Sequence, residues 1–168
     1  MADSTVQTLA TTGTGNDVYI AKGRRGDGRL LWISALNSDG LNFAQDMVYM
    51  PEHGLVAFLT SFENTLTYLG FPFFESRGSS DEIVALFRVS DGGAVAGHQI
   101  GGTGGETASH LKLMDDGRLL LTGGFQGICT FGPPDAIQRT SNGGLDGFIM
   151  TRRVESDLKR QGEAFLIR

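Results

Sequence analysis

The sequence predicts an all-β protein built from a repeated antiparallel unit, and three observations carry this prediction. One eight-residue pattern occurs three times, as GNDVYIAK at 15–22, SSDEIVAL at 79–86 and GLDGFIMT at 144–151. The apolar runs have the length of strands, and glycine supplies 25 of the 168 residues, which suits many tight turns. No window shows a sustained apolar pattern of helical period with capping residues.

The spacing of the three patterns defines the repeat. Their aspartates are Asp17, Asp81 and Asp146, which lie 64 and 65 residues apart. Later segments match in the same order, DGRLLWISAL with DGGAVAGHQI and GLVAFLTSF with GRLLLTGGF. One domain over 1–168 therefore holds a first repeat at about 15–78, a second at about 79–143 and a partial third at about 144–168. Each copy needs its neighbours to bury a core.

Each complete repeat is expected to contain four strands. In chain order they are expected at 18–22, 30–36, 45–50 and 55–61, then at 82–88, 94–100, 109–114 and 118–123, and in the third copy at 147–153 and 164–168. The separators carry Asp-Gly, Gly-Gly, Asn or Pro, which hairpins favour, and the segments 36–42 and 100–107 are interpreted as hairpin connections. Segments 68–72 and 130–134 are expected to link repeats, and a short helix is expected at most near 155–160. The connections are too short for crossover helices, so the strands should form an antiparallel meander.

Four antiparallel strands per repeat, with glycine-rich turns and a longer link between repeats, are typical of a β-propeller blade. The segments FGPP, TSNGG, LDGFIMT, GRLLW and GRLLLTGG resemble bacterial β-propeller repeats of the SBBP type. The aspartates Asp17, Asp81 and Asp146 match the aspartate of those repeats, and Trp32 matches their tryptophan, which the second copy replaces with Ala96. The resemblance implies a propeller fold and an exported or surface-associated bacterial protein. It implies no defined enzymatic activity.

The number of blades sets the expectation for partners. Ten expected strands make about two and a half blades, whereas complete propellers use 4–8. The chain is therefore expected either to be part of a longer propeller that supplies the missing blades or to close a ring by self-association. Two copies would give five blades. An open array has exposed strand edges that invite pairing with another chain, so we expect a homo-oligomer.

Charge and composition exclude several classes of partner. The net charge is −5 and the isoelectric point is about 5.1, which disfavours nucleic acid as a partner. No apolar run approaches the ~20 residues of a membrane span, and the first residues lack the basic and apolar regions of a signal peptide. The single cysteine, Cys129, cannot form an internal disulfide and is expected to be a small buried hydrophobe.

Two histidines are the first candidates for chemistry. His98 and His110 flank a predicted turn near Gly104 and could face each other across a hairpin, with Glu106 nearby, as ligands of a metal ion. The equivalent residues of the first repeat are Ser34 and Asp46. A metal site built into the repeat would share its ligands between copies, so we assign no metal and no cofactor. The histidines are expected to be exposed or hydrogen-bonded.

The remaining motifs predict turns rather than catalysis. The repeated aspartates lack the D-x-D-x-D-G pattern of calcium loops, and each is expected to cap backbone N–H groups of the loop before its strand. His53 is interpreted as a turn residue. The glycine-rich segment 101–107 lacks the Gly-Lys-Ser/Thr ending of a phosphate-binding loop, and no G-x-S-x-G motif is present. No catalytic residue is expected.

Four aromatic residues, Tyr68, Phe71, Phe73 and Phe74, form the largest local concentration of apolar surface. They are expected to pack between neighbouring blades or to form an exposed surface for oligomerisation or a partner. The function that fits these features is a non-enzymatic structural or interaction module that presents loops to a protein or glycan. Two alternatives remain open. One is a lectin with one shallow sugar site per blade, and the other is a metal-dependent hydrolase or lyase that uses His98, His110 and Glu106.

Overall fold

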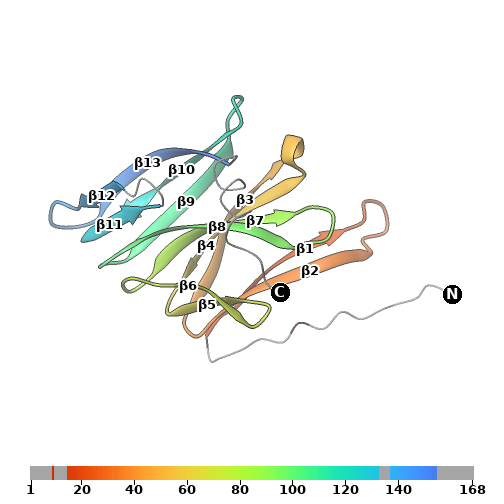
Figure 1. The fold of residues 1–168 in the computed structure, drawn as a ribbon, viewed down its shortest axis with the longest axis horizontal. Coiled ribbons are helices and arrows are strands. Elements are labelled where there is room, and N and C mark those ends of the chain that lie inside the picture. The colour runs from red at the N-terminus through yellow and green to blue at the C-terminus, as the bar shows by residue number, and fades with distance from the viewer. Residues whose placement is uncertain (1–8, 10–14, 133–136, 155–168) are drawn as a thin grey trace.

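The computed structural model describes residues 9, 15–132 and 137–154 (Figure 1). The prediction of an all-β fold is confirmed, because the elements of this part of the chain are strands and one short 3-10 helix, η1 (Pro51–His53). The strands are β1 (Val18–Gly23), β2 (Leu30–Ser38), β3 (Asn42–Met50), β4 (Leu55–Phe62), β5 (Thr65–Tyr68), β6 (Phe71–Glu75), β7 (Asp81–Arg88), β8 (Ala94–Gly102), β9 (Glu106–Leu113), β10 (Arg118–Phe125), β11 (Ile128–Phe131), β12 (Ile137–Thr140) and β13 (Asp146–Arg153). Over these residues, no helix is long and apolar enough to cross a membrane.

The strands form three sheets. Sheet I has the order β1-β2-β5-β6, sheet II the order β12-β11-β8-β7-β4-β3, and sheet III the order β13-β10-β9. Neighbouring strands pair antiparallel throughout, in register over the eight residue pairs of β4 with β7 and the eight pairs of β10 with β13. Antiparallel sheets were predicted from the short connections, and the pairing confirms them.

Sheet II lies between the other two sheets, as Figure 1 shows, and two separate cores fill the junctions. Strand β4 is buried along its whole length, and its alternate residues point to opposite faces. Ala57 and Leu59 join the core between sheets II and III, whereas Val56 and Phe58 join the core between sheets I and II. A strand buried on both faces reads as a continuous apolar run, which the sequence LVAFLTSF provides.

Sheets II and III each combine strands from two successive repeats, whereas the four strands of sheet I all come from the first repeat. Sheet II joins β3 and β4, from the end of the first repeat, to β7 and β8, from the start of the second. Sheet III joins β9 and β10 to β13 in the same way, so β7 and β13 hold equivalent places. The four neighbouring strands β3, β4, β7 and β8 of sheet II therefore straddle a repeat boundary, with two strands from each copy. Hydrogen bonds across the repeat boundary hold adjacent copies together.

Two hairpins occupy the segments that were expected to be links. Strands β5 and β6 extend sheet I beyond β2, and β11 and β12 extend sheet II beyond β8. Pro72 belongs to β6, which ends its sheet, and an edge strand tolerates a residue without an N–H donor. Leu69 and Gly70 adopt positive φ angles of 53° and 80° in the turn between β5 and β6. The strand expected at 164–168 and the short helix expected near 155–160 lie outside the described residues.

Candidate functional site

The repeated aspartates lie at the starts of equivalent strands and accept backbone hydrogen bonds. Asp81 Oδ2 accepts the N–H of Arg77 at 3.1 Å, and Asp146 Oδ2 accepts the N–H of Asn142 at 3.0 Å, in each case four residues earlier. These are the loop-capping contacts predicted for them. Asp17 Oδ1 accepts the N–H of Ser38 at 3.1 Å. All three carboxylates therefore hold backbone, Asp81 and Asp146 that of the preceding loop and Asp17 that of the end of β2.

Three buried carboxyl side chains lie near the starts of β7 and β9. Asp81, Glu82 and Glu106 are 0%, 0% and 1% exposed. A parallel bridge between Ser80 and Gly105 brings the two strand starts together, and the N–H of Glu106 donates to the carbonyl of Ser80 at 3.0 Å. We call these three residues the carboxyl cluster.

Few donors reach the carboxyl cluster. Gln99 Nε2 donates to Asp81 at 2.6 Å, Gln45 Nε2 donates to Glu82 at 3.1 Å, and the N–H of Gly102 donates to Glu106 at 3.1 Å. Within the described residues no hydrogen-bond donor reaches the second carboxyl oxygen of any member, namely Asp81 Oδ1, Glu82 Oε2 and Glu106 Oε1. A buried ionised carboxylate with a free oxygen is costly, and the group responds by retaining its proton.

Burial accordingly raises the pKa of all three groups. It raises the pKa of Glu82 to about 8, although the hydrogen bond from Gln45 opposes this. Burial together with the charge of Asp81 raises the pKa of Glu106 to about 7, and burial also raises the pKa of Asp81. The interaction between the Asp81 and Glu106 side chains raises the pKa of Glu106 and lowers that of Asp81, so it favours the protonated form of Glu106.

The carboxyl cluster borders an open pocket of about 310 Å³. Glu82 and Glu106 line it together with Gln45, Phe43 and Thr107. Within the described residues no three His, Cys, Asp or Glu side chains are arranged to hold a metal ion. The pocket therefore offers protonated carboxyl groups that ionise as the pH rises, which makes the surrounding junction sensitive to pH.

The structure contradicts the hypothesis that His98 and His110 face each other across a hairpin. The connection 100–107 does not close a hairpin, because β8 belongs to sheet II and β9 to sheet III. His98 is buried and its Nε2 lies 3.2 Å from Arg152 Nη1. Burial, with the charge of Arg152, lowers the pKa of His98 to about 3, so its ring is neutral.

The other proposed ligands lie elsewhere. His110 is exposed on β9, where its Nδ1 is 4.0 Å from Asp46 Oδ2, and Asp46 is the equivalent residue of the preceding repeat. Glu106 points into the carboxyl cluster and accepts a hydrogen bond from Gly102. The connection 36–42 was likewise interpreted as a hairpin, and it too leads from one sheet to the next. A turn that crosses between sheets cannot be told from a hairpin turn by its residues alone, since both need glycine and asparagine.

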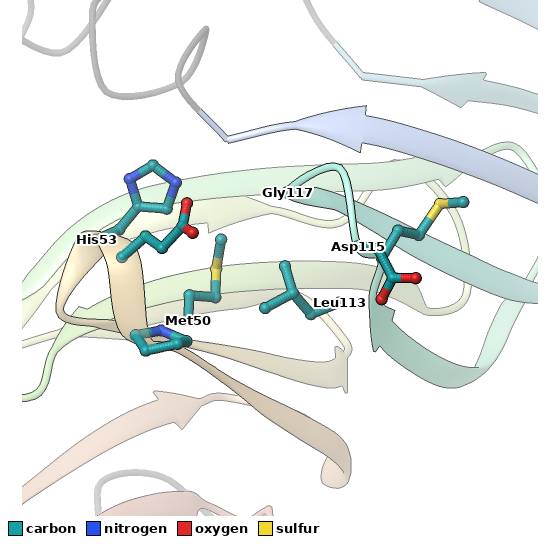
Figure 2. A pocket seen from close by; sticks show the side chains of 8 residues that line it. Met50, His53, Leu113, Asp115 and Gly117 are labelled. Atoms are coloured by element: carbon teal, nitrogen blue, oxygen red, sulfur yellow. The ribbon is translucent and has the colours of Figure 1, made fainter.

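The β3–β4 and β9–β10 turns, which are repeat equivalents, lie beside a second pocket (Figure 2). This pocket has a volume of about 220 Å³, and Met50 and Leu113 form its apolar floor. His53 lies in η1, as its interpretation as a turn residue predicts, and Asp115 lies on the opposite side.

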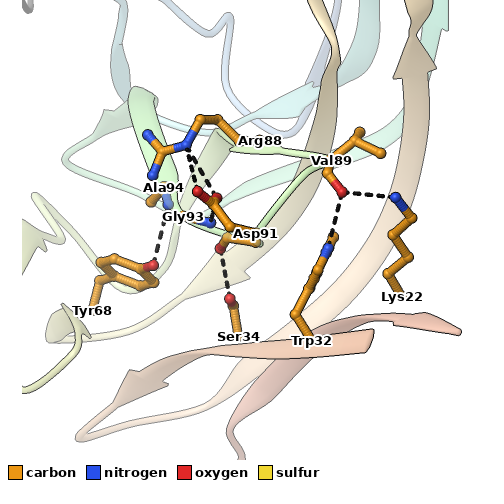
Figure 3. Close-up of polar contacts among 10 residues, drawn as sticks. Lys22, Trp32, Ser34, Tyr68, Arg88, Val89, Asp91, Gly93 and Ala94 are labelled. Carbon is orange, nitrogen blue, oxygen red and sulfur yellow. Dashed lines mark hydrogen bonds and ion pairs between the residues drawn. The ribbon is translucent and has the colours of Figure 1, made fainter. Parts of the chain in front are cut away.

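Trp32 and the aromatic residues connect sheet I to the turn between β7 and β8 (Figure 3). Trp32 Nε1 and Lys22 Nζ both donate to the carbonyl of Val89, at 3.0 and 2.9 Å. The N–H of Ala94 donates to the Tyr68 hydroxyl at 3.1 Å. Trp32 is buried, so it is a packing residue in this chain.

The aromatic residues pack within the chain. Tyr68, Phe73 and Phe74 are half-buried against the core between sheets I and II, and the ring centroids of Phe73 and Phe74 are 4.7 Å apart. A Cβ at Gly97 would lie 2.4 Å from the Phe74 ring, so sheet and ring fit closely. These contacts agree with the packing interpretation rather than with an exposed partner surface. The Phe71 side chain lies outside the described part of the structure.

Some exposed apolar residues lie on the outward faces of the two outer sheets, while others, such as Met47 and Tyr49 of β3 and Leu69 of the β5–β6 turn, lie elsewhere. Tyr19 is 66% exposed and Leu31 is 45% exposed on sheet I, and Ile149 is 77% exposed on sheet III. Single exposed apolar residues are common. These three occupy strand positions whose neighbours along the strand point into a core, so they mark the faces of sheets I and III that sheet II does not cover.

Two of these features were missed by reasoning from the sequence. The carboxyl cluster has one detectable signal, since Glu82 stands inside an apolar strand at the position that Val18 occupies in the first repeat. The outward faces have none, because an exposed apolar residue such as Ile149 stands in the sequence between core-facing apolar residues, here Phe148 and Met150. Comparison of the chain with known proteins gave no matching family model, curated protein or solved structure.

Proposed function

We propose that this chain is a non-enzymatic structural and interaction module of β-propeller type that associates with further copies of itself. The observation that carries the proposal is that the three sheets differ in their number of strands and in how many of their faces another sheet covers. Sheet II has six strands and is covered on both faces, whereas sheets I and III have four and three strands over the described residues and are each covered by sheet II on one face.

The stacking of the sheets supports propeller-type blades. Neighbouring blades of a propeller pack face to face around an axis, and the face-to-face arrangement of sheets I, II and III fits this pattern. The pairing across repeat boundaries supports it as well, because β4–β7 and β10–β13 tie each copy to the next in the same way. In an assembly of this kind, the loops between strands stay available for a protein or glycan partner.

The separation of the proposed metal ligands favours this module over the metal-dependent hydrolase. His98 contacts Arg152 in one junction, His110 lies on the surface beside Asp46, and Glu106 belongs to the carboxyl cluster. Among the described residues no observation favours a sugar site that recurs in each repeat, so we do not propose the lectin alternative.

The mass of the protein in solution tests the proposal. Light scattering coupled to size-exclusion chromatography should give a mass that is a multiple of the 18.0 kDa chain and that persists on dilution. A monomer at every concentration from about 1 to 500 µM, a range that covers ordinary association constants, would contradict it.

A further inference from the structure

We propose that the outward face of sheet I in one copy packs against the outward face of sheet III in a second copy, head to tail. This inference rests on the proposed function and names the surfaces that carry out the association.

The two internal junctions bury equivalent faces. The face of sheet I that meets sheet II carries Ile20, Trp32 and Leu36. The face of sheet II that meets sheet III carries Val84, Ala96 and Ile100, which lie 64 residues later in each case. Sheets I and II therefore use the same face, with equivalent residues, to pack against the sheet that follows each of them in the stack.

The opposite faces, with which sheets II and III pack against the sheet before each of them, correspond as well. Sheet II turns Ile83 and Ala85 toward sheet I, and sheet III turns Phe148 and Met150, which lie 65 residues later, toward sheet II. One pair of complementary faces therefore makes both junctions. A contact between unlike faces that recurs with the same geometry is heterologous, and it can continue until a ring closes.

The same register identifies the two faces that the described residues leave unpaired. Tyr19 on sheet I corresponds to Ile83 on sheet II. Ile83 is completely buried in the core between sheets I and II, whereas Tyr19 is 66% exposed.

On sheet III, Ile149 corresponds to Val84 of sheet II. Val84 is 3% exposed, whereas Ile149 is 77% exposed. Leu120 of β10 lies next to it on the same face, opposite Thr151 in the ladder, and corresponds to the buried Ala57. The outward faces of sheets I and III thus carry apolar residues at positions that are buried inside the chain.

The occupant that fits these faces is a second copy of this chain, because the interface would continue a contact made twice within it. Sheet I of the second copy would lie on sheet III of the first as sheet III lies on sheet II. Since the two faces differ, one copy can use both of them at once. A symmetric pairing of two identical faces would instead stop at a dimer.

Two single variants and their mixture test the inference. Tyr19→Lys alters only the sheet I face and Ile149→Glu only the sheet III face, and both side chains are exposed in the isolated chain. Each variant alone should lose association, with a shift of at least tenfold in the concentration at which oligomers form. An equimolar mixture should recover one junction and give a one-to-one dimer, because each variant keeps the face that the other has lost.

Leu69→Glu is the matched control, since Leu69 is 76% exposed but lies in the β5–β6 turn away from both faces, and it should assemble as the wild type does. Circular dichroism and the fluorescence of Trp32 establish that each variant is folded, and Tyr19→Ser and Ile149→Thr replace any that is not. A wild-type protein that stays monomeric overturns the proposed function and this contact together. An oligomer that survives both variants, or that only one of them disrupts, overturns this contact and leaves self-association standing.

Discussion

Replacing Glu82 by glutamine should make the protein less sensitive to alkaline pH. Glutamine keeps the shape of the side chain and the oxygen that accepts the hydrogen bond from Gln45, but it cannot ionise. The change therefore isolates the cost of a negative charge inside the junction between sheets II and III.

The size of the effect follows from the pKa of Glu82, which is about 8 in the folded protein against an ordinary value of 4.5. The folded state binds this proton more tightly than the unfolded state, so stability falls as the pH rises from 4.5 to 8 and is constant outside that window. Each pKa unit corresponds to ~1.4 kcal/mol, which gives a full cost of about 5 kcal/mol above pH 8. Between pH 5 and pH 8 the wild type should lose roughly 3 kcal/mol through Glu82.

Urea unfolding at a fixed protein concentration measures this loss, with the fluorescence of Trp32 and circular dichroism as two probes of one transition. The free energy of unfolding of Glu82→Gln should fall by less than that of the wild type between pH 5 and pH 8. Asp81 and Glu106 add to the fall that remains, while the lowered pKa of His98 opposes it. Glu52→Gln, the same change on the exposed helix η1, should follow the wild type. A wild-type stability that is flat or rises over this range would refute the reasoning, as would equal losses in the wild type and Glu82→Gln.

Three further predictions concern packing. Gly101→Ala should destabilise the fold by about 1–3 kcal/mol, because a Cβ there would lie 1.7 Å from the buried carboxylate of Asp81; Gly144→Ala, where no atom lies within 4 Å, should be neutral in the same urea titration. Trp32→Phe should cost about 1 kcal/mol for the lost indole hydrogen bond, measured by circular dichroism, and an unchanged midpoint would show that this bond contributes nothing. Cys129 is completely buried and burial raises its pKa to about 12, so a thiol reagent should label it in denaturant but not in the native protein at pH 8, and rapid native labelling would contradict its placement.

The sequence was sufficient to predict the strands of the repeated pattern. The predicted strands at 18–22 and 118–123 fall within β1 and β10, because apolar runs bounded by glycine turns have few alternatives to an antiparallel strand. The hairpins of β5 with β6 and of β11 with β12 were missed. Pro72 lies in a segment that was expected to link two repeats, and only the sheet order shows that β6 is an edge strand where proline is tolerated.

The contacts between sheets could not be predicted in this way. Ser80 and Gly105 approach each other only because β8 and β9 part into different sheets, and that separation places Glu106 beside Asp81 rather than beside a histidine. Local residue preferences describe a turn but not the sheet to which the next strand belongs. The strand positions of His98 and His110 were therefore predictable, whereas their surroundings were not.

The offset between repeat and sheet has a consequence for how the copy number of the repeat can change. A duplication or loss of about 64 consecutive residues at any position adds or removes one complete set of strands, because the β4–β7 and β10–β13 pairings are equivalent. The cut can even fall inside a strand, provided that the same register position is rejoined. By contrast, a chain divided between the first and second repeats would split sheet II and expose both cores. Proteins of this architecture can therefore gain or lose whole repeats without forming a new kind of contact between sheets. They cannot be cut between two sequence repeats without dividing a sheet.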